Sequence, residues 1–234
     1  MKIEDLIILA AQKYGDYDAD GADDDAKYSR VKVEDWVKFY NSAQRQLILQ
    51  RPDANYKFDQ WQLTAGQTKQ DLPAAAIALI SLDRNMGTDG ATPGAPVREV
   101  DRAVIDDFIS SWHSDTGEAA VELYAYSLRT PRQFWVYPRV HSSTAVYVEG
   151  AYGYAFTEAA YASISTTDVE ADDQFINPIL EWMLREAWSI DTDSARSSAL
   201  AQGHEQAFYR ALGIEFQSKS LISGEGGNSR GNNS

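Results

Sequence analysis

The spacing of apolar residues changes twice along this chain, from helical to strand-like and back to helical. Near the start, Ile3, Leu6, Ile7 and Ala10 recur at helical spacing, which predicts an amphipathic helix over residues 2–14. A second, longer helical face follows it, formed by Val33, Trp36, Val37, Tyr40, Ala43, Leu47 and Ile48. Because one side of each helix is apolar, both helices are expected to pack against partners.

The middle of the chain is typical of strands. From about residue 56, short runs rich in aromatic and β-branched residues are separated by Gly, Pro, Asp and Ser. A short helix is expected at residues 102–108, and the turn-rich residues 87–96 predict a mobile loop or hairpin tip. Helical spacing returns near Asp172, and a last helix is expected over residues 194–212.

Together these patterns predict an α+β fold that is mainly α. The helices of residues 1–55 and 171–213 are expected to close into a helical bundle, which a β-rich insertion with a short helix, residues 56–170, interrupts. Gly213 is suited to end the last helix in the left-handed conformation. The polar residues 214–234 cannot form a core, so they are expected to be a flexible C-terminal tail.

Charge and composition exclude several classes of protein. Acidic residues outnumber basic ones by 35 to 21, which gives a net charge of −14. Such a surface repels the phosphates of nucleic acids and anionic membranes. The absence of cysteine excludes disulfides and thiolate sites, and it fits assembly in a reducing cytoplasm. The N-terminal residues lack the features of a signal peptide, and the longest later apolar run, residues 74–82, is too short to span a bilayer.

An aspartate-rich stretch resembles the beginning of a calcium-binding EF-hand loop. Asp16, Asp18, Asp20 and Gly21 match its first, third, fifth and sixth positions. However, the twelfth position, which needs a bidentate Glu, is Lys27. We therefore interpret the stretch as a solvated loop held open by its own repulsion, with weak divalent-cation binding at most. No cofactor or specific metal site is predicted.

Catalytic motifs are not found in the sequence. The three histidines, His113, His141 and His204, are scattered and lack metal-ligand spacing. An alternative hypothesis is a tail-associated or secreted glycan-binding or hydrolytic module, because abundant carboxylates and aromatic residues could form a sugar cleft. The aromatic residues in question lie in strand-like runs, where core or cross-strand positions are more common: Trp61, Trp135, Tyr137, Tyr147 and Tyr152.

Several segments, in order and spacing, resemble the head-to-tail adaptor (connector or neck) proteins of tailed bacteriophages. The resemblance covers most of the chain and lies in residues 36–54, 63–87, 96–108, 131–140 and 207–214. It implies a helical bundle with a β-rich extension, assembled as a twelvefold ring beneath the portal protein. Such a ring extends the DNA channel and offers a docking surface to tail or nozzle proteins. It implies no enzyme activity, and it implies location in the virion neck after assembly in the host cytoplasm.

A second acidic segment lies near the end of the chain's strand-like part and the start of the helix after it. Residues 157–193 contain nine acidic residues and one basic residue, Arg185. A DNA channel works better if its wall does not bind phosphates, so this segment is a candidate for a surface facing the lumen or a neighbouring subunit. A plain solvated helix face is the alternative. The candidate residues are Asp168, Glu170, Asp172 and Asp173.

The C-terminal segment is the candidate for portal binding. Ile214, Phe216, Leu221 and Ile222 are apolar residues in an otherwise polar stretch. A segment that folds upon binding uses such residues as anchors. Packing back onto the chain's own helices is the alternative. The loop of residues 87–96 and the β-rich insertion are candidates for contacts with neighbouring subunits or tail proteins.

Overall fold

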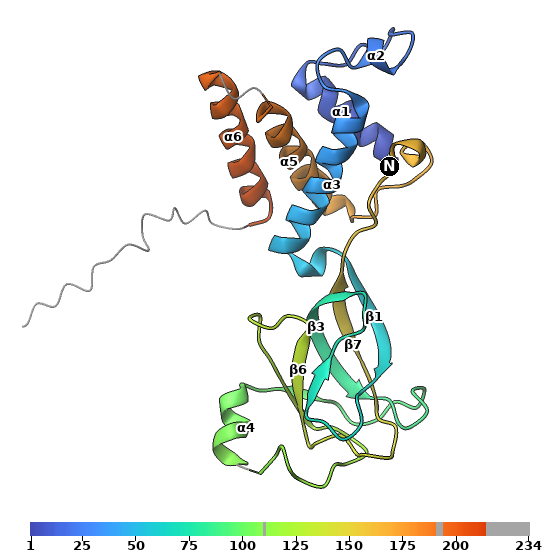
Figure 1. Ribbon diagram of the computed structural model, residues 1–234, viewed down its shortest axis with the longest axis vertical. Helices are drawn as coiled ribbons and strands as arrows, with labels where there is room; N and C mark the ends of the chain where they lie inside the picture. Colours follow the sequence, from blue (N-terminus) through green and yellow to red (C-terminus); the bar gives the residue numbers. More distant parts are fainter. Residues whose placement is uncertain (110, 191–193, 214–234) are drawn as a thin grey trace, which may run out of the picture.

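The chain has an elongated shape, with most of the helices at one end and the strands with helix α4 at the other (Figure 1). The computed structural model describes residues 1–109, 111–190 and 194–213. The fold is mixed α+β, as predicted. Its helices and short 3-10 turns are α1 Ile3–Tyr14, α2 Asp24–Lys27, α3 Val33–Gln50, η1 Pro52–Ala54, α4 Arg102–Phe108, η2 Tyr161–Ser163, η3 Asp173–Phe175, α5 Ile176–Trp188 and α6 Ala195–Ala211.

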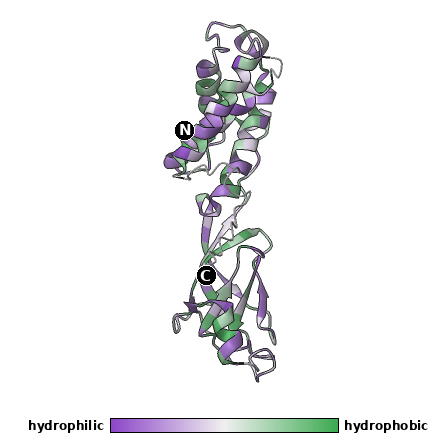
Figure 2. Cartoon of the chain, turned by 90° about the vertical axis from the view of Figure 1, so that its left-hand side faces the viewer, coloured by the Kyte–Doolittle hydropathy of each residue, from purple (hydrophilic) through white to green (hydrophobic). Residues whose placement is uncertain are grey.

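In the helical half, α5 packs against α1, α3 and α6. Hydrophilic and hydrophobic residues alternate along these helices (Figure 2), because each helix turns one face toward the shared core. The face predicted for α3 is buried in that core through Val33, Trp36, Val37, Tyr40, Ala43 and Leu47. At the other end of this half, α6 ends as predicted: Gly213 has a φ of 69°, and its N–H donates to the carbonyl of Arg210.

The strands form two small sheets that share one hydrophobic core. One sheet has the order β1-β7-β3 and is antiparallel. The other has the order β2-β6-β5-β4, and its β4–β5 pair is parallel. Trp61, Leu82 and Phe134, from the two sheets, belong to the same buried cluster. The strands are β1 Tyr56–Gln62, β2 Lys69–Asp71, β3 Ala76–Asn85, β4 Arg98–Glu99, β5 Leu123–Tyr126, β6 Gln133–Tyr137 and β7 Tyr147–Tyr154.

Helix α4 covers the outer side of the second sheet. Ile105 of α4 lies in a small cluster with Trp112 and Ala125, against which the half-buried ring of Trp135 packs. Alternation along β6 explains this arrangement, since Phe134 points into the shared core and Trp135 points away from it. The second sheet is therefore covered on both faces at β5 and β6.

The two halves meet where η1 lies against β7 and β3. The N–H of Tyr154 donates to the carbonyl of Asn55 (2.9 Å), which links the end of β7 to the chain just before β1. The side chain of Asn55 donates to Glu170 (3.2 Å), which lies in the segment that leads from β7 back to the helices. Backbone and side-chain bonds thus both fasten the junction.

The turn-rich residues 87–96 form the predicted hairpin tip. An antiparallel bridge pairs Arg84 with Pro96, and the N–H of Gly94 donates to the carbonyl of Asn85 (2.7 Å). Within the loop, the carboxylate of Asp89 accepts from the N–H groups of residues 91 and 92, which lowers the pKa of Asp89. The loop is closed by its own hydrogen bonds, while its mobility stays a prediction.

None of the helices in the described part of the chain combines the length and apolar character needed to cross a membrane.

Candidate interaction surfaces

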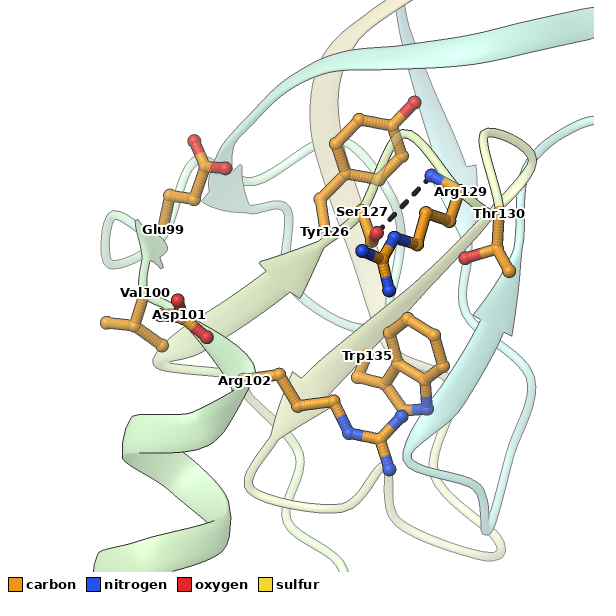
Figure 3. Close-up of a pocket in the computed structure, with 9 residues that line it drawn as sticks. All are labelled: Glu99, Val100, Asp101, Arg102, Tyr126, Ser127, Arg129, Thr130 and Trp135. Carbon is orange, nitrogen blue, oxygen red and sulfur yellow. Dashed lines mark hydrogen bonds between the residues drawn. The ribbon is translucent and has the colours of Figure 1, made fainter. Parts of the chain in front are cut away.

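A pocket of about 790 Å³ lies between the start of α4 and the β5–β6 hairpin (Figure 3). One wall comes from the end of β4 and the first turn of α4, and the other from the hairpin and β6. Both walls are built on the second sheet, so its strand pairing fixes their separation. The lining residues are Glu99, Val100, Asp101, Arg102, Tyr126, Ser127, Arg129, Thr130 and Trp135.

The pocket presents hydrogen-bond donors. The guanidinium of Arg102 lies over the Trp135 ring, 4.5 Å from its centroid, and pairs with Asp106 at 3.3 Å. Arg129 is exposed, and its guanidinium has no ion pair among the described residues. The hydroxyl of Thr130 is buried without a hydrogen-bond partner in the same part of the chain. An unsatisfied buried hydroxyl costs free energy, and its burial keeps it out of reach of a docking partner.

The acidic side chains of the pocket are already engaged within the fold. Asp101 caps α4 by accepting from the N–H of Ala103 (2.9 Å). Glu99 accepts from the hydroxyl of Tyr124 (3.2 Å). Burial, followed by the charge of Glu99, raises the pKa of Tyr124 to about 12, so this hydroxyl stays a donor at neutral pH. The pocket therefore carries groups of both charges, the carboxylates of Glu99 and Asp101 beside the guanidinium groups of Arg102 and Arg129.

Large apolar residues are exposed on α4, in the β5–β6 hairpin and on β1. On α4, Val104 and Phe108 are four residues apart and share one face, and Phe108 is 82% exposed. Leu128, in the β5–β6 hairpin, is 78% exposed. On β1, Tyr56 and Phe58 are both more than half exposed. Exposed apolar residues are typical of protein interfaces where they form a contiguous patch.

The aspartate-rich loop has a structural role at its first position. The buried carboxylate of Asp16 accepts from the hydroxyl of Ser29 (2.8 Å) and from the N–H groups of Arg30 and Val31 (2.7 and 2.8 Å). The interpretation of a fully solvated loop is therefore wrong at Asp16. The short helix α2 also lies in this stretch. Asp18 accepts from the N–H of Asp20 (3.0 Å).

No group of three or more His, Cys, Asp or Glu side chains that could hold a metal ion occurs in residues 1–109, 111–190 and 194–213.

Replacing Asp16 by Ala is expected to lower the free energy of unfolding by about 2 kcal/mol, because two N–H groups and one hydroxyl lose their acceptor. The control variants Asp18→Ala and Asp20→Ala should each change it by less than about 0.5 kcal/mol. Urea denaturation followed by circular dichroism measures the three values. A rise of the melting temperature with calcium that is lost in Asp18→Ala would instead indicate a metal site.

Comparison with known protein families assigns the chain to one of them. The model of the family described as SU10 adaptor protein matches residues 1–230. The chain belongs to this family. The resemblance to bacteriophage head-to-tail adaptors found in the sequence is thereby confirmed at the level of the family. No curated protein matches the sequence significantly.

The four acidic candidates have different surroundings in the structure. Asp168 is exposed and pairs with Lys2 (3.1 Å). Glu170 accepts from the side chain of Asn55 and from the N–H of Thr157 (2.9 Å), so it joins segments of the fold. Asp172 and Asp173, at the start of η3, are exposed. A role facing DNA or a neighbouring subunit stays a prediction for all four residues: Asp168, Glu170, Asp172 and Asp173.

The portal-binding candidates of the adaptor, Ile214, Phe216, Leu221 and Ile222, lie outside the described residues.

The aromatic residues that motivated a glycan-binding alternative and the histidines considered as metal ligands have structural contacts. Trp61 and Tyr152 form an edge-to-face pair with centroids 5.7 Å apart, as expected of cross-strand aromatic residues. The Nδ1 of His113 lies 2.8 Å from the hydroxyl of Thr68, and that of His204 lies 2.7 Å from the carboxylate of Glu181. Trp135 lines the pocket with Arg102.

The sequence did not predict the pocket between α4 and the β5–β6 hairpin. Its two walls are about thirty residues apart in the chain, and only the pairing of β4 with β5 brings them together. The one available signal was residues 127–132, a turn with two arginines and no acidic residue in a strongly acidic chain. That signal indicates an unusual turn but does not give its partner.

Proposed function

We propose that this chain is a structural head-to-tail adaptor of a tailed phage, without catalytic activity. Copies form a twelvefold ring beneath the portal protein, extend the DNA channel and provide the docking surface for tail or nozzle proteins. The observation that carries the proposal is the match of the SU10 adaptor protein family to residues 1–230. The protein is then a component of the virion neck, assembled in the host cytoplasm.

The charge of the chain supports a channel through which double-stranded DNA passes without specific binding. A net charge of −14 gives no release of counterions from DNA that would favour binding. In this proposal, the four acidic residues from Asp168 to Asp173 face the lumen or a neighbouring subunit. The packed helices form a helical bundle, from which the β half extends.

The C-terminal segment is the proposed contact with the portal. It follows α6, whose last turn is anchored by Phe208, so the attachment point is part of the helical core. Ile214, Phe216, Leu221 and Ile222 supply the apolar anchors of this contact.

Light scattering on the purified chain, alone and mixed with portal rings from the same genome, tests this proposal. We expect a stoichiometric complex with the portal that is lost when residues 214–234 are deleted. A complex that survives the deletion would retain the adaptor function but refute the proposed contact. If the chain does not bind the portal, the adaptor function itself is refuted.

A further inference from the structure

Strand β1 differs from the other edge strands of the two sheets. Among the described residues the edges are β1 and β3 in one sheet and β2 and β4 in the other. Strands β2 and β4 have only three and two residues. Strand β3 has three register shifts, and its Asn85 N–H donates to Ala95 in the following loop (2.9 Å). Short, bulged and covered edges resist pairing with another chain. Strand β1 has none of these features, because Tyr56–Gln62 pairs with β7 in unbroken register at one side of the β half (Figure 1).

The outer side of β1 carries free backbone groups. The carbonyl of Asn55 bonds to the end of β7, so alternation turns the odd-numbered residues of β1 toward β7. The N–H and C=O groups of Tyr56, Phe58 and Gln60 therefore point away from the sheet. Of these groups, the N–H of Gln60 donates to the carboxylate of Asp59 (2.9 Å). The others have no hydrogen-bond partner in the described part of the chain.

An edge of this kind is complementary to itself. In an antiparallel pair, two opposite residues exchange both N–H···O bonds, so the same edge on a second copy supplies every donor with an acceptor. The side chains of Tyr56, Phe58 and Gln60 are exposed on one face of the strand, which leaves room for a second strand beside them. Tyr56 and Phe58 are both more than half exposed, so pairing also brings aromatic rings together.

Charge selects one alignment of the two strands. Lys57 and Asp59 lie on the other face of β1, and their side chains are 57% and 36% exposed. If Phe58 is opposite Phe58 of the second copy, each Lys57 lies opposite an Asp59. Sliding one strand by two residues puts Lys57 opposite Lys57 in one direction and Asp59 opposite Asp59 in the other. Like charges directly opposite each other are destabilising, so the alignment centred on Phe58 is favoured.

The existing bonds of these two side chains are compatible with that alignment. Lys57 pairs with Asp59 of its own strand at 2.5 Å, and an ammonium group has three N–H donors. The carboxylate of Asp59 also accepts from the N–H of Gln60 and the hydroxyl of Tyr152 (3.2 Å), while a carboxylate offers about four acceptor sites. Each ammonium can therefore lie between two carboxylates without loss of its own pair.

We propose that two copies of the free chain pair through β1 in an antiparallel, two-fold contact centred on Phe58. The two Phe58 residues exchange hydrogen bonds, and the N–H of each Tyr56 donates to the Gln60 carbonyl of the other copy. The Gln60 N–H keeps its bond to Asp59. The sheets of the two copies then form one continuous sheet, and its joint covers an edge that is otherwise open to wrong partners. A two-fold contact closes on itself, so it is separate from the ring proposed above and does not rest on it.

Disulfide trapping in the cysteine-free chain tests the alignment. In Phe58→Cys the two thiols lie on directly opposite residues, whose Cα atoms are about 5.5 Å apart in such a pair, within the range of a disulfide. Oxidation should therefore give a covalent dimer on a non-reducing gel. Tyr56→Cys should give none, because Tyr56 lies opposite Gln60, whereas Tyr56→Cys plus Gln60→Cys should give the dimer again. Leu49→Cys, at an exposed position of α3, is the control for random collision and should give none.

Two charge variants test the same contact without cysteine. Lys57→Asp makes both positions acidic, and Asp59→Lys makes both basic, so each variant should associate with itself about tenfold more weakly than the unmodified chain. A mixture of the two variants should pair at least as well as the unmodified chain, because every charge again meets an opposite one. Analytical ultracentrifugation over a concentration series measures association, and circular dichroism shows that each variant is folded.

The outcomes separate this inference from the proposed function. An unmodified chain that stays monomeric up to the highest concentration, or single charge variants that associate as it does, would overturn the β1 contact. A covalent dimer of equal yield from Tyr56→Cys or Leu49→Cys would overturn it as well. Binding to portal rings in the same samples would leave the adaptor function intact. A chain that pairs through β1 but does not bind the portal would refute the adaptor function and leave the contact standing.

Discussion

Replacing Gly153 by Ala is expected to lower the free energy of unfolding by about 3 kcal/mol, because the added methyl group has no space. A Cβ at this position would lie 2.1 Å from the carbonyl oxygen of Pro52 and 3.6 Å from Cγ1 of Ile77. The glycine has no positive φ, so the cost comes from collision rather than from backbone strain. Pro52 begins η1, so relief of the collision would move the chain that joins the two halves.

The matched control is Gly203→Ala in α6. A Cβ at this position would meet nothing within 4 Å, and alanine favours a helix over glycine by about 1 kcal/mol, so this variant should be more stable. Urea denaturation of both variants, followed by circular dichroism, measures the two opposite changes. Wild-type stability of Gly153→Ala would contradict the prediction and show that η1 shifts at little cost.

The helices could be predicted closely from the sequence. Each is buried on one side, so its apolar residues recur at helical spacing. The spacing of Ile3, Leu6, Ile7 and Ala10 predicted a helix over residues 2–14, and α1 spans Ile3–Tyr14. The expected short helix at residues 102–108 is α4. Gly213 ends α6 in the left-handed conformation because few other residues adopt it at low cost.

Long-range pairing could not be predicted, because no local pattern specifies a distant partner. Strand β1 pairs with β7, with Phe58 opposite Ala151. This pairing makes β1 an edge strand and gives it the exposed face, neither of which follows from its own sequence. The role of Asp16 was missed for the same reason. Its carboxylate accepts from the N–H groups of residues 30 and 31, which lie beyond the stretch that resembles a calcium-binding loop.

Replacing Phe208 by Ala is expected to lower the free energy of unfolding by about 3 to 5 kcal/mol, the usual cost of removing a buried ring. Phe208 is fully buried, and its ring lies 4.9 Å from that of Trp182 in α5. Helix α6 buries few side chains, so this ring supplies much of its attachment to the core. The control Gln206→Ala removes an exposed side chain from the same helix and should change stability by less than about 0.5 kcal/mol.

The loss of Phe208 should also weaken binding to the portal, because the proposed contact begins directly after α6. If α6 is detached from the core, each binding event must also order this helix, which costs free energy. Hydrogen exchange on the free variant should therefore show faster exchange in α6 than in α3, and light scattering should show a weaker portal complex at a temperature where the variant remains folded. Phe208→Leu keeps most of the buried volume and should restore most of the binding. Full portal binding by a Phe208→Ala chain with rapidly exchanging α6 would separate the contact from this helix and assign it to another part of the chain.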